Sequence, residues 1–260
     1  MFDRVSGRLV PSEKGKKLFV EIGPLFDQLN ELTRFTVNLK NTKAGHLKFA
    51  MTPAFGLEVG PMALAHFSKN NPDITIETET LHAHQVVKAL LDNSIDIGLV
   101  FDAPRFPGIQ KQTIVESGFV CVAPERTKLP NSKALKISDL QNFPIITLNQ
   151  KSVLGKILTH KLEDAFEEPV NSNIVVETYH LAKRLVKQNA GIAIIDAITA
   201  LSGDVSGLQV RKIMPVIPIN VDVIMRLNEP LTKFQSLFNQ DLKSAMNEFQ
   251  SKKQYTQLIK

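Results

Sequence analysis

Short apolar runs typical of buried strands alternate with longer amphipathic stretches typical of helices, from residue 47 onward. In the first half of the chain, strands are expected at 47–51, 74–78 and 95–101, with helices between them at 57–70 and 84–91. Parallel strands need a crossover of a dozen or more residues, and the crossover is usually a helix. This order therefore predicts a parallel or mixed sheet flanked by helices.

The same alternation restarts in the second half of the chain. The expected strands are 119–122, 145–148, 173–178, 191–195 and 221–226, and the expected helices are 153–166, 179–188 and 231–249. Two α/β units in series, with the chain returning late, predict an α/β fold of two lobes that face a cleft.

The first 45 residues have a different pattern. Apolar side chains recur at alternating intervals of four and three, which is the seam of helices that pack on one another, and they include Leu18, Ile22, Leu25, Leu29 and Leu32. Ser12 precedes this run and is expected to cap the helix. Asn41–Gly45 is polar and ends in glycine, so a linker is expected there. The pattern fits equally an amphipathic helix docked on its own domain and a dimerising helix.

Composition excludes several classes of protein. The chain has 260 residues, 43% of them hydrophobic and 22% charged, which excludes a disordered chain. It has no apolar run long enough to span a membrane and no secretion signal. The single cysteine, Cys121, lies in an apolar strand and is expected to be buried, which fits a reducing compartment and a cytoplasmic location. Of the net charge of +5, residues 1–43 carry eight basic and five acidic side chains. This excess fits contact with a polyanion or an ordinary solvated surface.

Catalytic motifs are absent from the sequence. It contains no phosphate-binding glycine loop, no metalloprotease helix and no nucleophile elbow. His82 and His84 have the spacing of two ligands on one strand face, but no cysteine or carboxylate completes a site. We therefore expect no enzyme activity, no metal and no cofactor.

Binding signals are clearer than catalytic ones. Met51–Gly56 joins the end of one expected strand to the start of a helix, the place where open α/β sheets bind small ligands. Residues 100–104 and 146–150 lie at further strand ends. A threonine hydroxyl with free backbone amides suits a carboxylate or phosphate, while the alternative is a plain helix cap and turn.

Taken together, these segments resemble the LysR-type transcriptional regulators over essentially the whole chain. Phe2–Gly15 is similar to the end of that family's DNA-binding domain, where the wing leads into the linker helix. Gly45–Ala50 is similar to the opening of its effector domain. Two internal segments also match, Asn93–Leu99, with Asn93 where glycine is commoner, and Ala190–Ile195.

The resemblance implies three parts. Residues 1–15 would be the wing, a remnant of a winged helix-turn-helix domain, and 16–43 the dimerising linker helix. Residues 44–250 would be an effector domain like a periplasmic binding protein, with lobe I at about 44–102 and 222–250 and lobe II at about 103–221. The recognition helix should precede Phe2, so the chain is expected to be N-terminally truncated relative to the family, which puts specific DNA binding in question.

The resemblance also implies partners and site residues. Residues 195–197, 209–218 and 148–155 are similar to regulators that sense lysine precursors, arginine or opines, so an amino acid or a derivative is the implied effector. Arg4 and Arg8 would contact DNA phosphates in a homodimer or homotetramer. The implied effector-binding residues are Thr52, Pro53, Ala54, Phe55, Asp102, Ala103, Thr147, Leu148, Asn149 and Asp196.

Two other functions fit the same architecture. One is a stand-alone two-lobe module that binds a small molecule and acts by heterodimerisation with full-length relatives. The other is a solute-binding protein, which would need export.

Overall fold

A computed structural model of the protein has two compact units, Met1–His46 with Asp73–Thr75 and Leu47–Pro72 with Ile76–Lys260. The residues that it describes are 1–5, 7–23, 25, 29, 45–166, 170, 172–227, 229–252 and 255–259.

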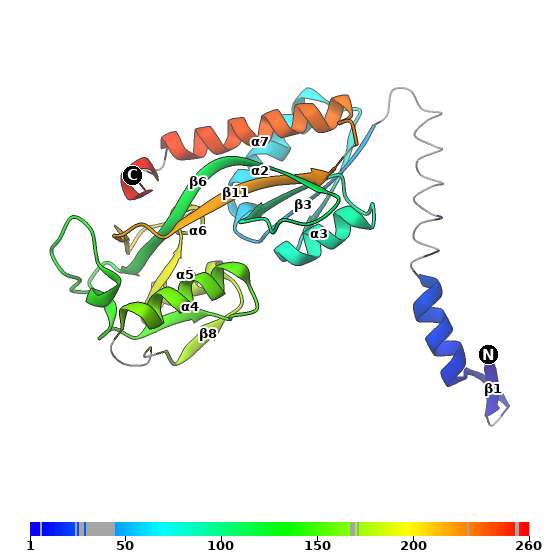
Figure 1. Ribbon diagram of the computed structural model, residues 1–260, viewed down its shortest axis with the longest axis horizontal. Coiled ribbons are helices and arrows are strands. Elements are labelled where there is room, and N and C mark those ends of the chain that lie inside the picture. Colours follow the sequence, from blue (N-terminus) through cyan, green and yellow to red (C-terminus); the bar gives the residue numbers. More distant parts are fainter. Residues whose placement is uncertain are drawn as a thin grey trace. The chain divides into compact units, whose positions relative to one another are not determined.

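The first unit contains an antiparallel hairpin and the start of a helix (Figure 1). Strands β1 (Phe2–Val5) and β2 (Arg8–Pro11) pair, and residues 13–23 follow as a helix. The Ser12 hydroxyl accepts a hydrogen bond of 3.1 Å from the Gly15 amide, which confirms the predicted helix cap.

The second unit contains one long mixed sheet of nine strands in the order β4-β3-β5-β11-β6-β9-β7-β8, with β10 paired to β6. The bounds of these strands are β3 (His46–Met51), β4 (Thr75–Thr80), β5 (Ile97–Phe101), β6 (Ile109–Pro124), β7 (Ile145–Leu148), β8 (Ile174–Val176), β9 (Ile192–Asp196), β10 (Leu208–Lys212) and β11 (Pro218–Arg226).

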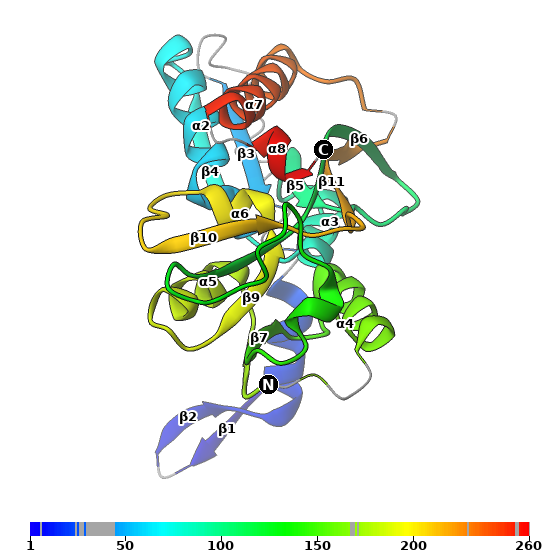
Figure 2. The same ribbon diagram turned by 90° about the vertical axis from the view of Figure 1, so that its left-hand side faces the viewer.

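Helices flank the sheet along its length (Figure 2). The α-helices are α2 (Val59–Asn70), α3 (Ala83–Leu91), α4 (Val153–Ala165), α5 (Tyr179–Lys187), α6 (Ala197–Leu201), α7 (Lys233–Lys252) and α8 (Tyr255–Ile259), and the 3-10 helices are η1 (Phe55–Leu57) and η2 (Ile137–Leu140). Helix α7 packs on α2, where Phe238 meets Phe49 and Phe67 edge to face, with ring centroids 4.9 and 5.3 Å apart.

Two long strands connect the halves of this unit. Strand β11 pairs with β6 from Arg226 opposite Ile109 to Pro218 opposite Gly118 (Figure 1). We call the half that holds β3, β4, β5, α2, α3 and α7 lobe I, and the half that holds β7, β8, β9, β10, α4, α5 and α6 lobe II. The two-lobed α/β fold expected from the alternation is therefore confirmed. The burial expected for Cys121 on β6 is also confirmed, and burial raises the pKa of its thiol to about 12.

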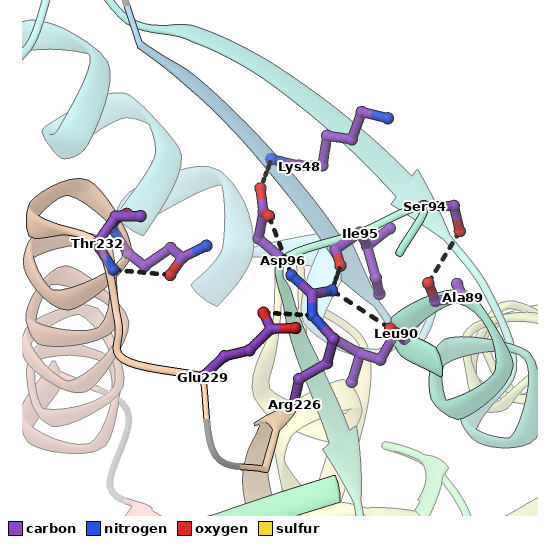
Figure 3. Close-up of polar contacts among 10 residues, drawn as sticks. Lys48, Ala89, Leu90, Ser94, Ile95, Asp96, Arg226, Glu229 and Thr232 are labelled. Carbon is purple, nitrogen blue, oxygen red and sulfur yellow. Dashed lines mark hydrogen bonds and ion pairs between the residues drawn. The ribbon is translucent and has the colours of Figure 1, made fainter. Parts of the chain in front are cut away.

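The segment Asn93–Leu99 begins with a residue in the left-handed conformation. Asn93 has a φ of 57°, in the left-handed region where glycine is favoured and asparagine is tolerated. Three residues later, Asp96 accepts a hydrogen bond of 2.8 Å from the Lys48 amide and lies 3.7 Å from the Arg226 guanidinium (Figure 3). Asp96 therefore joins β3, β5 and β11 at one end of lobe I.

Replacement of Arg226 by alanine is expected to lower the free energy of unfolding by about 1–2 kcal/mol. The guanidinium donates to the backbone carbonyls of Leu90 (3.2 Å) and Ile95 (2.7 Å), and the substitution removes both hydrogen bonds (Figure 3). Urea denaturation measures the loss. Glu229→Gln is the control, since Glu229 is exposed and its ion pair with Arg226 is worth under about 1 kcal/mol. Equal losses in the two variants would contradict the assigned role of the carbonyl contacts.

Candidate functional site

One cavity of about 400 Å³ in the second unit has residues of both lobes in its lining. Lobe I contributes the Thr52–Ala54 turn after β3, the start of α3 at His82–His84, and Phe101 at the end of β5. Lobe II contributes the end of β7, the starts of α4 and α5, and Thr199 of α6. The cavity therefore lies where strands end and helices begin, which is the usual ligand site of open α/β sheets.

Three helices of eight or more residues begin at this cavity, and a side chain accepts a backbone hydrogen bond at the start of each. The Ser152 hydroxyl accepts from the Gly155 amide at 2.9 Å, and the Thr178 hydroxyl accepts from the Leu181 amide at 3.4 Å. At α3, the His82 amide donates to the Gln85 side chain at 2.9 Å. First-turn amides and helix dipoles place positive partial charge at helix N-termini, so the three together favour an anion in the cavity.

Two residues of the lining have a buried hydroxyl group with no hydrogen-bond partner within the described part of the chain. They are Thr52 and Tyr179, which are 9% and 7% exposed. A buried hydroxyl without a partner costs roughly 1–3 kcal/mol. Burial, together with the charge of Asp196, raises the pKa of Tyr179 well above its usual range, so its phenol stays protonated and able to donate. Unpaired polar groups that line one cavity are what a polar ligand would satisfy.

Asp196 lies outside the lining of the cavity and contacts Thr199, which is part of it. Its side chain is fully buried and caps α6 by accepting from the Thr199 amide at 2.8 Å. The second carboxylate oxygen has no hydrogen-bond partner among the described residues. Burial raises the pKa of Asp196 to about 6, although hydrogen bonds from Thr199 act in the opposite direction.

The structure brings half of the proposed effector-binding residues to the cavity. Those in its lining are Thr52, Pro53, Ala54, Leu148 and Asn149. Their role in binding an effector stays a prediction.

The other five lie outside the lining. Phe55 is buried against Phe101, with ring centroids 4.6 Å apart. Thr147 hydrogen bonds Ser172 at 2.9 Å and lines a separate hollow beside β8. Asp102 accepts from Asn220 at 3.0 Å, the Ala103 amide donates to Asp222, and Asp196 accepts from the Thr199 amide.

Reasoning from strand ends missed the helix-start residues, chiefly Lys151, Ser152, Glu177, Tyr179 and Thr199. The signal that points to four of them was present in the sequence. Ser152 and Thr178 stand directly before two expected helices, so the residues beside those caps belong to the same edge of the sheet as the strand ends. Thr199 had no such signal, because helix α6 was not expected.

Two contacts bridge the lobes beside the cavity. The His82 ring nitrogen of lobe I lies 3.2 Å from the Glu177 carboxylate of lobe II, and both side chains line the cavity. The Glu58 carboxylate, between η1 and α2, accepts from the Gly203 amide after α6 at 3.0 Å. Both bridges involve partly exposed groups, so the free energy that they add to a closed cleft is small.

Histidine in this cavity does not form a metal site. His82 and His84 stack with ring centroids 6.2 Å apart. No group of three or more His, Cys, Asp or Glu side chains suited to a metal ion occurs within the described ranges.

Among the helices of the described residues, none has the length and apolar character needed to cross a membrane.

Strands β6 and β11 cross from one lobe to the other, and we call them the crossing strands. They carry a buried carboxylate where the lobes join. Asp222 of β11 is fully buried at the point where the register between β11 and β6 shifts. Its carboxylate accepts from the Thr113 hydroxyl at 2.6 Å and the Ala103 amide at 2.8 Å, and the Lys111 ammonium lies 3.2 Å away. These contacts hold the first residues after β5 against both crossing strands.

In the first unit, Arg4 lies exposed on β1 and Arg8 is the first residue of β2. The seam residues Leu18, Leu25 and Leu29 are exposed in the single chain, and Ile22 is half-buried. Leu32 lies outside the described residues.

Comparison with known proteins identifies relatives over nearly the whole chain. The HTH-type transcriptional regulator DgcR of Pseudoalteromonas sp is 28% identical over 248 residues, which cover 95% of this chain and 84% of DgcR. The transcriptional activator protein LysR of Escherichia coli is 26% identical over 248 residues, which cover 95% of this chain and 79% of LysR. These relatives are regulators of transcription and not enzymes.

Solved structures share the fold. Full-length CbnR in complex with its target DNA superposes with a TM-score of 0.70 at 17% identity, covering 93% of this chain and 83% of CbnR. The effector-binding domain of BenM with its effector benzoate gives 0.68 at 18% identity, covering 79% of this chain and 94% of that domain. The regulatory domain of CcmR from Synechocystis PCC6803 in complex with 2-PG gives 0.68 at 17% identity, covering 77% of this chain and 96% of that domain.

The family model of the LysR substrate binding domain matches residues 40–246, which include every strand and helix of both lobes up to most of α7. The protein therefore belongs to the LysR-type transcriptional regulators, with this domain as its effector-binding domain.

Proposed function

We propose that this regulator binds a small carboxylate, an amino acid or a derivative of one, in the cavity between its lobes and alters transcription in response. The observation that carries the proposal is the pair of buried, unpaired hydroxyls of Thr52 and Tyr179, residues of different lobes that line one cavity. Three helix N-termini at the same cavity favour an anionic group. Benzoate in BenM and 2-PG in CcmR support an effector of this kind in a domain of this fold.

The residues in and behind the lining would have different roles in binding the effector. The hydroxyls of Thr52 and Tyr179 would bind the carboxylate together with the first-turn amides of α4 and α5. Pro53, Ala54, Leu148 and Asn149 would complete the shape of the cavity. Phe55, Asp102, Ala103, Thr147 and Asp196 would act from behind the lining by fixing the ends of the strands.

The effector would act by favouring one angle between the lobes. A ligand that contacts both lobes stabilises the closed arrangement by its differential affinity for that arrangement. The change would pass to a dimer or tetramer through the linker helix, with Leu18, Ile22, Leu25, Leu29 and Leu32 as its seam. The hairpin β1–β2 would be the wing, with Arg4 and Arg8 on DNA phosphates, and the protein would work in the cytoplasm.

A thermal-shift screen of the twenty common amino acids, followed by calorimetric titration of those that stabilise the protein, tests the site. Thr52→Ala and Tyr179→Phe are each expected to weaken binding about tenfold to a hundredfold, because each removes a hydrogen bond to a charged group. Without ligand, both variants should be as stable as the wild type or more so, since each removes an unpaired buried hydroxyl.

Thr147→Ala is the matched control. It removes the same hydroxyl from a threonine that lies outside the cavity and bonds Ser172, so ligand affinity should stay unchanged. Loss of affinity in Thr147→Ala but not in Thr52→Ala would overturn the site.

A further inference from the structure

The cavity carries more positive charge than a single carboxylate requires. Lys151 and Lys156 lie in its lining beside the start of α4, and neither ammonium has an ion-pair partner within the part of the chain that the structure describes. Against them, the lining contains one acidic side chain, Glu177, which is 69% exposed and paired with His82.

The position of the two lysines conflicts with the helix that they flank. Lys151 precedes the cap of α4 and Lys156 lies in its first turn, where the helix dipole disfavours a cation. A cation at a helix N-terminus without a compensating contact in the protein departs from the usual sequence preference. Such departures are typical of functional sites. An anion in the cavity would compensate both the dipole and the two lysines.

We infer that the effector carries a second carboxylate, bound by Lys151 and Lys156, and that it is therefore an acidic amino acid. This inference rests on the proposed function. One carboxylate lies over the hydroxyls of Thr52 and Tyr179, and the second faces the two ammonium groups at the start of α4. The amino group of the ligand takes the side of the cavity nearest Glu177. Basic amino acids are excluded by the same charges.

The experiment compares pairs of ligands that differ by one charge and little in shape. Aspartate with asparagine, and glutamate with glutamine, are titrated calorimetrically into the full chain at pH 7.5 and constant ionic strength, with lysine and arginine as basic comparators. At least one acid is expected to bind ten times more tightly than its amide. The ratio should fall as salt rises, because exposed lysines are screened. Lysine and arginine should not bind.

Variants separate the lysines from the rest of the site. Lys151→Gln and Lys156→Gln should each weaken binding of the acid about threefold to tenfold and leave binding of the amide unchanged. The double variant should remove the preference. Lys161→Gln is the matched control, since Lys161 is also on α4, pairs with Asp164 at 3.8 Å and lies outside the lining.

The possible failures are distinct. Amides that bind as tightly as their acids, or binding of lysine or arginine in their place, would overturn the acidic effector and leave the amino-acid site standing. A preference for the acid that survives the double variant would overturn the role of Lys151 and Lys156. If none of the six compounds binds the folded chain, the acidic effector is overturned. The outcome of the twenty-compound screen then decides separately whether the proposed function survives.

Discussion

Replacement of Asp222 by alanine is expected to lower the free energy of unfolding by roughly 3 kcal/mol, measured by urea denaturation at pH 7. The side chain is fully buried and accepts hydrogen bonds from Thr113 and the Ala103 amide. Truncation leaves both donors unpaired and removes the partner of the Lys111 ammonium, which lies 3.2 Å away. Since Lys111 is about one-third exposed, water solvates part of its ammonium group in the variant. This solvation keeps the loss of stability at the lower end of the range for a broken buried ion pair.

Asp222→Asn separates charge from shape. The amide keeps one acceptor for the Thr113 hydroxyl or the Ala103 amide, so about half of the loss is expected. Lys111→Met tests the ion pair from the other side and should be less harmful than Asp222→Ala, because the carboxylate keeps its two hydrogen bonds. If Asp222→Ala unfolds at the urea concentration of the wild type, the assignment of Asp222 as the anchor of the crossing strands is wrong.

Asp196→Asn is expected to raise the free energy of unfolding above pH 6 by up to roughly 3 kcal/mol, from 1.36 kcal/mol for each unit of pKa difference. Burial raises the pKa of Asp196 from 3.8 to about 6, so the folded protein holds a proton there that the unfolded chain has lost. Below pH 4 both states are protonated and no cost arises. Between pH 4 and 6 the wild type loses stability as pH rises, and above pH 6 the cost of the buried carboxylate is complete.

Asparagine removes that cost and keeps the cap of α6, since asparagine caps helices as well as aspartate does. The titratable groups that face Asp196 are Tyr179 of α5 and Tyr255 of α8, whose pKa values are both raised by burial, so both stay neutral throughout this range. The difference in stability between variant and wild type, measured at each pH from 4 to 8, should therefore report Asp196 alone.

Asp204→Asn provides a control of opposite sign. Asp204 is exposed, and its ion pair with Lys187 lowers the pKa of its carboxyl, so its ionised form favours the folded state. Any change from this substitution should be a small loss of stability rather than a gain. A difference between Asp196→Asn and wild type that is constant from pH 4 to 8 would show that Asp196 titrates normally.

Local patterns were sufficient to predict most of the strands and helices. Residues 145–148 and 153–166 were expected as strand and helix, and the structure has them as β7 and α4 within one residue. Alternation of apolar and polar residues is a local property, and such segments adopt the same structure in many surroundings. Strand β10, helices α6 and α8 and the first half of β6 were not predicted, because they are short or polar and form only against a partner element.

The residues of the site also fall into those that the sequence predicts and those that only the folded structure reveals. The strand ends alone pointed to Thr52–Ala54 and Leu148–Asn149, because ligands bind at the carboxyl ends of strands in open α/β sheets. Strands β3 and β7 run in opposite directions in the sheet, so these two ends meet only because the two lobes face each other. No pattern in the sequence separates Thr52, which lines the cavity, from Thr147, which faces away from it. Adjacent positions on a strand point to opposite faces, and which face meets the cleft depends on the pairing of the whole sheet.

The amino-acid sequence by itself determined the two-lobed α/β fold, the cap at Ser12 and the burial of Cys121, since each depends on the spacing and polarity of neighbouring residues. Only the tertiary structure decided that Asp96 and Asp222 hold strands together, and that Asp196 is buried against Thr199 outside the cavity lining. It also decided that Tyr179 and Thr199 meet Thr52 from the other lobe. These arrangements join residues that are distant along the chain, and burial and charge act on them only once the sheet has formed.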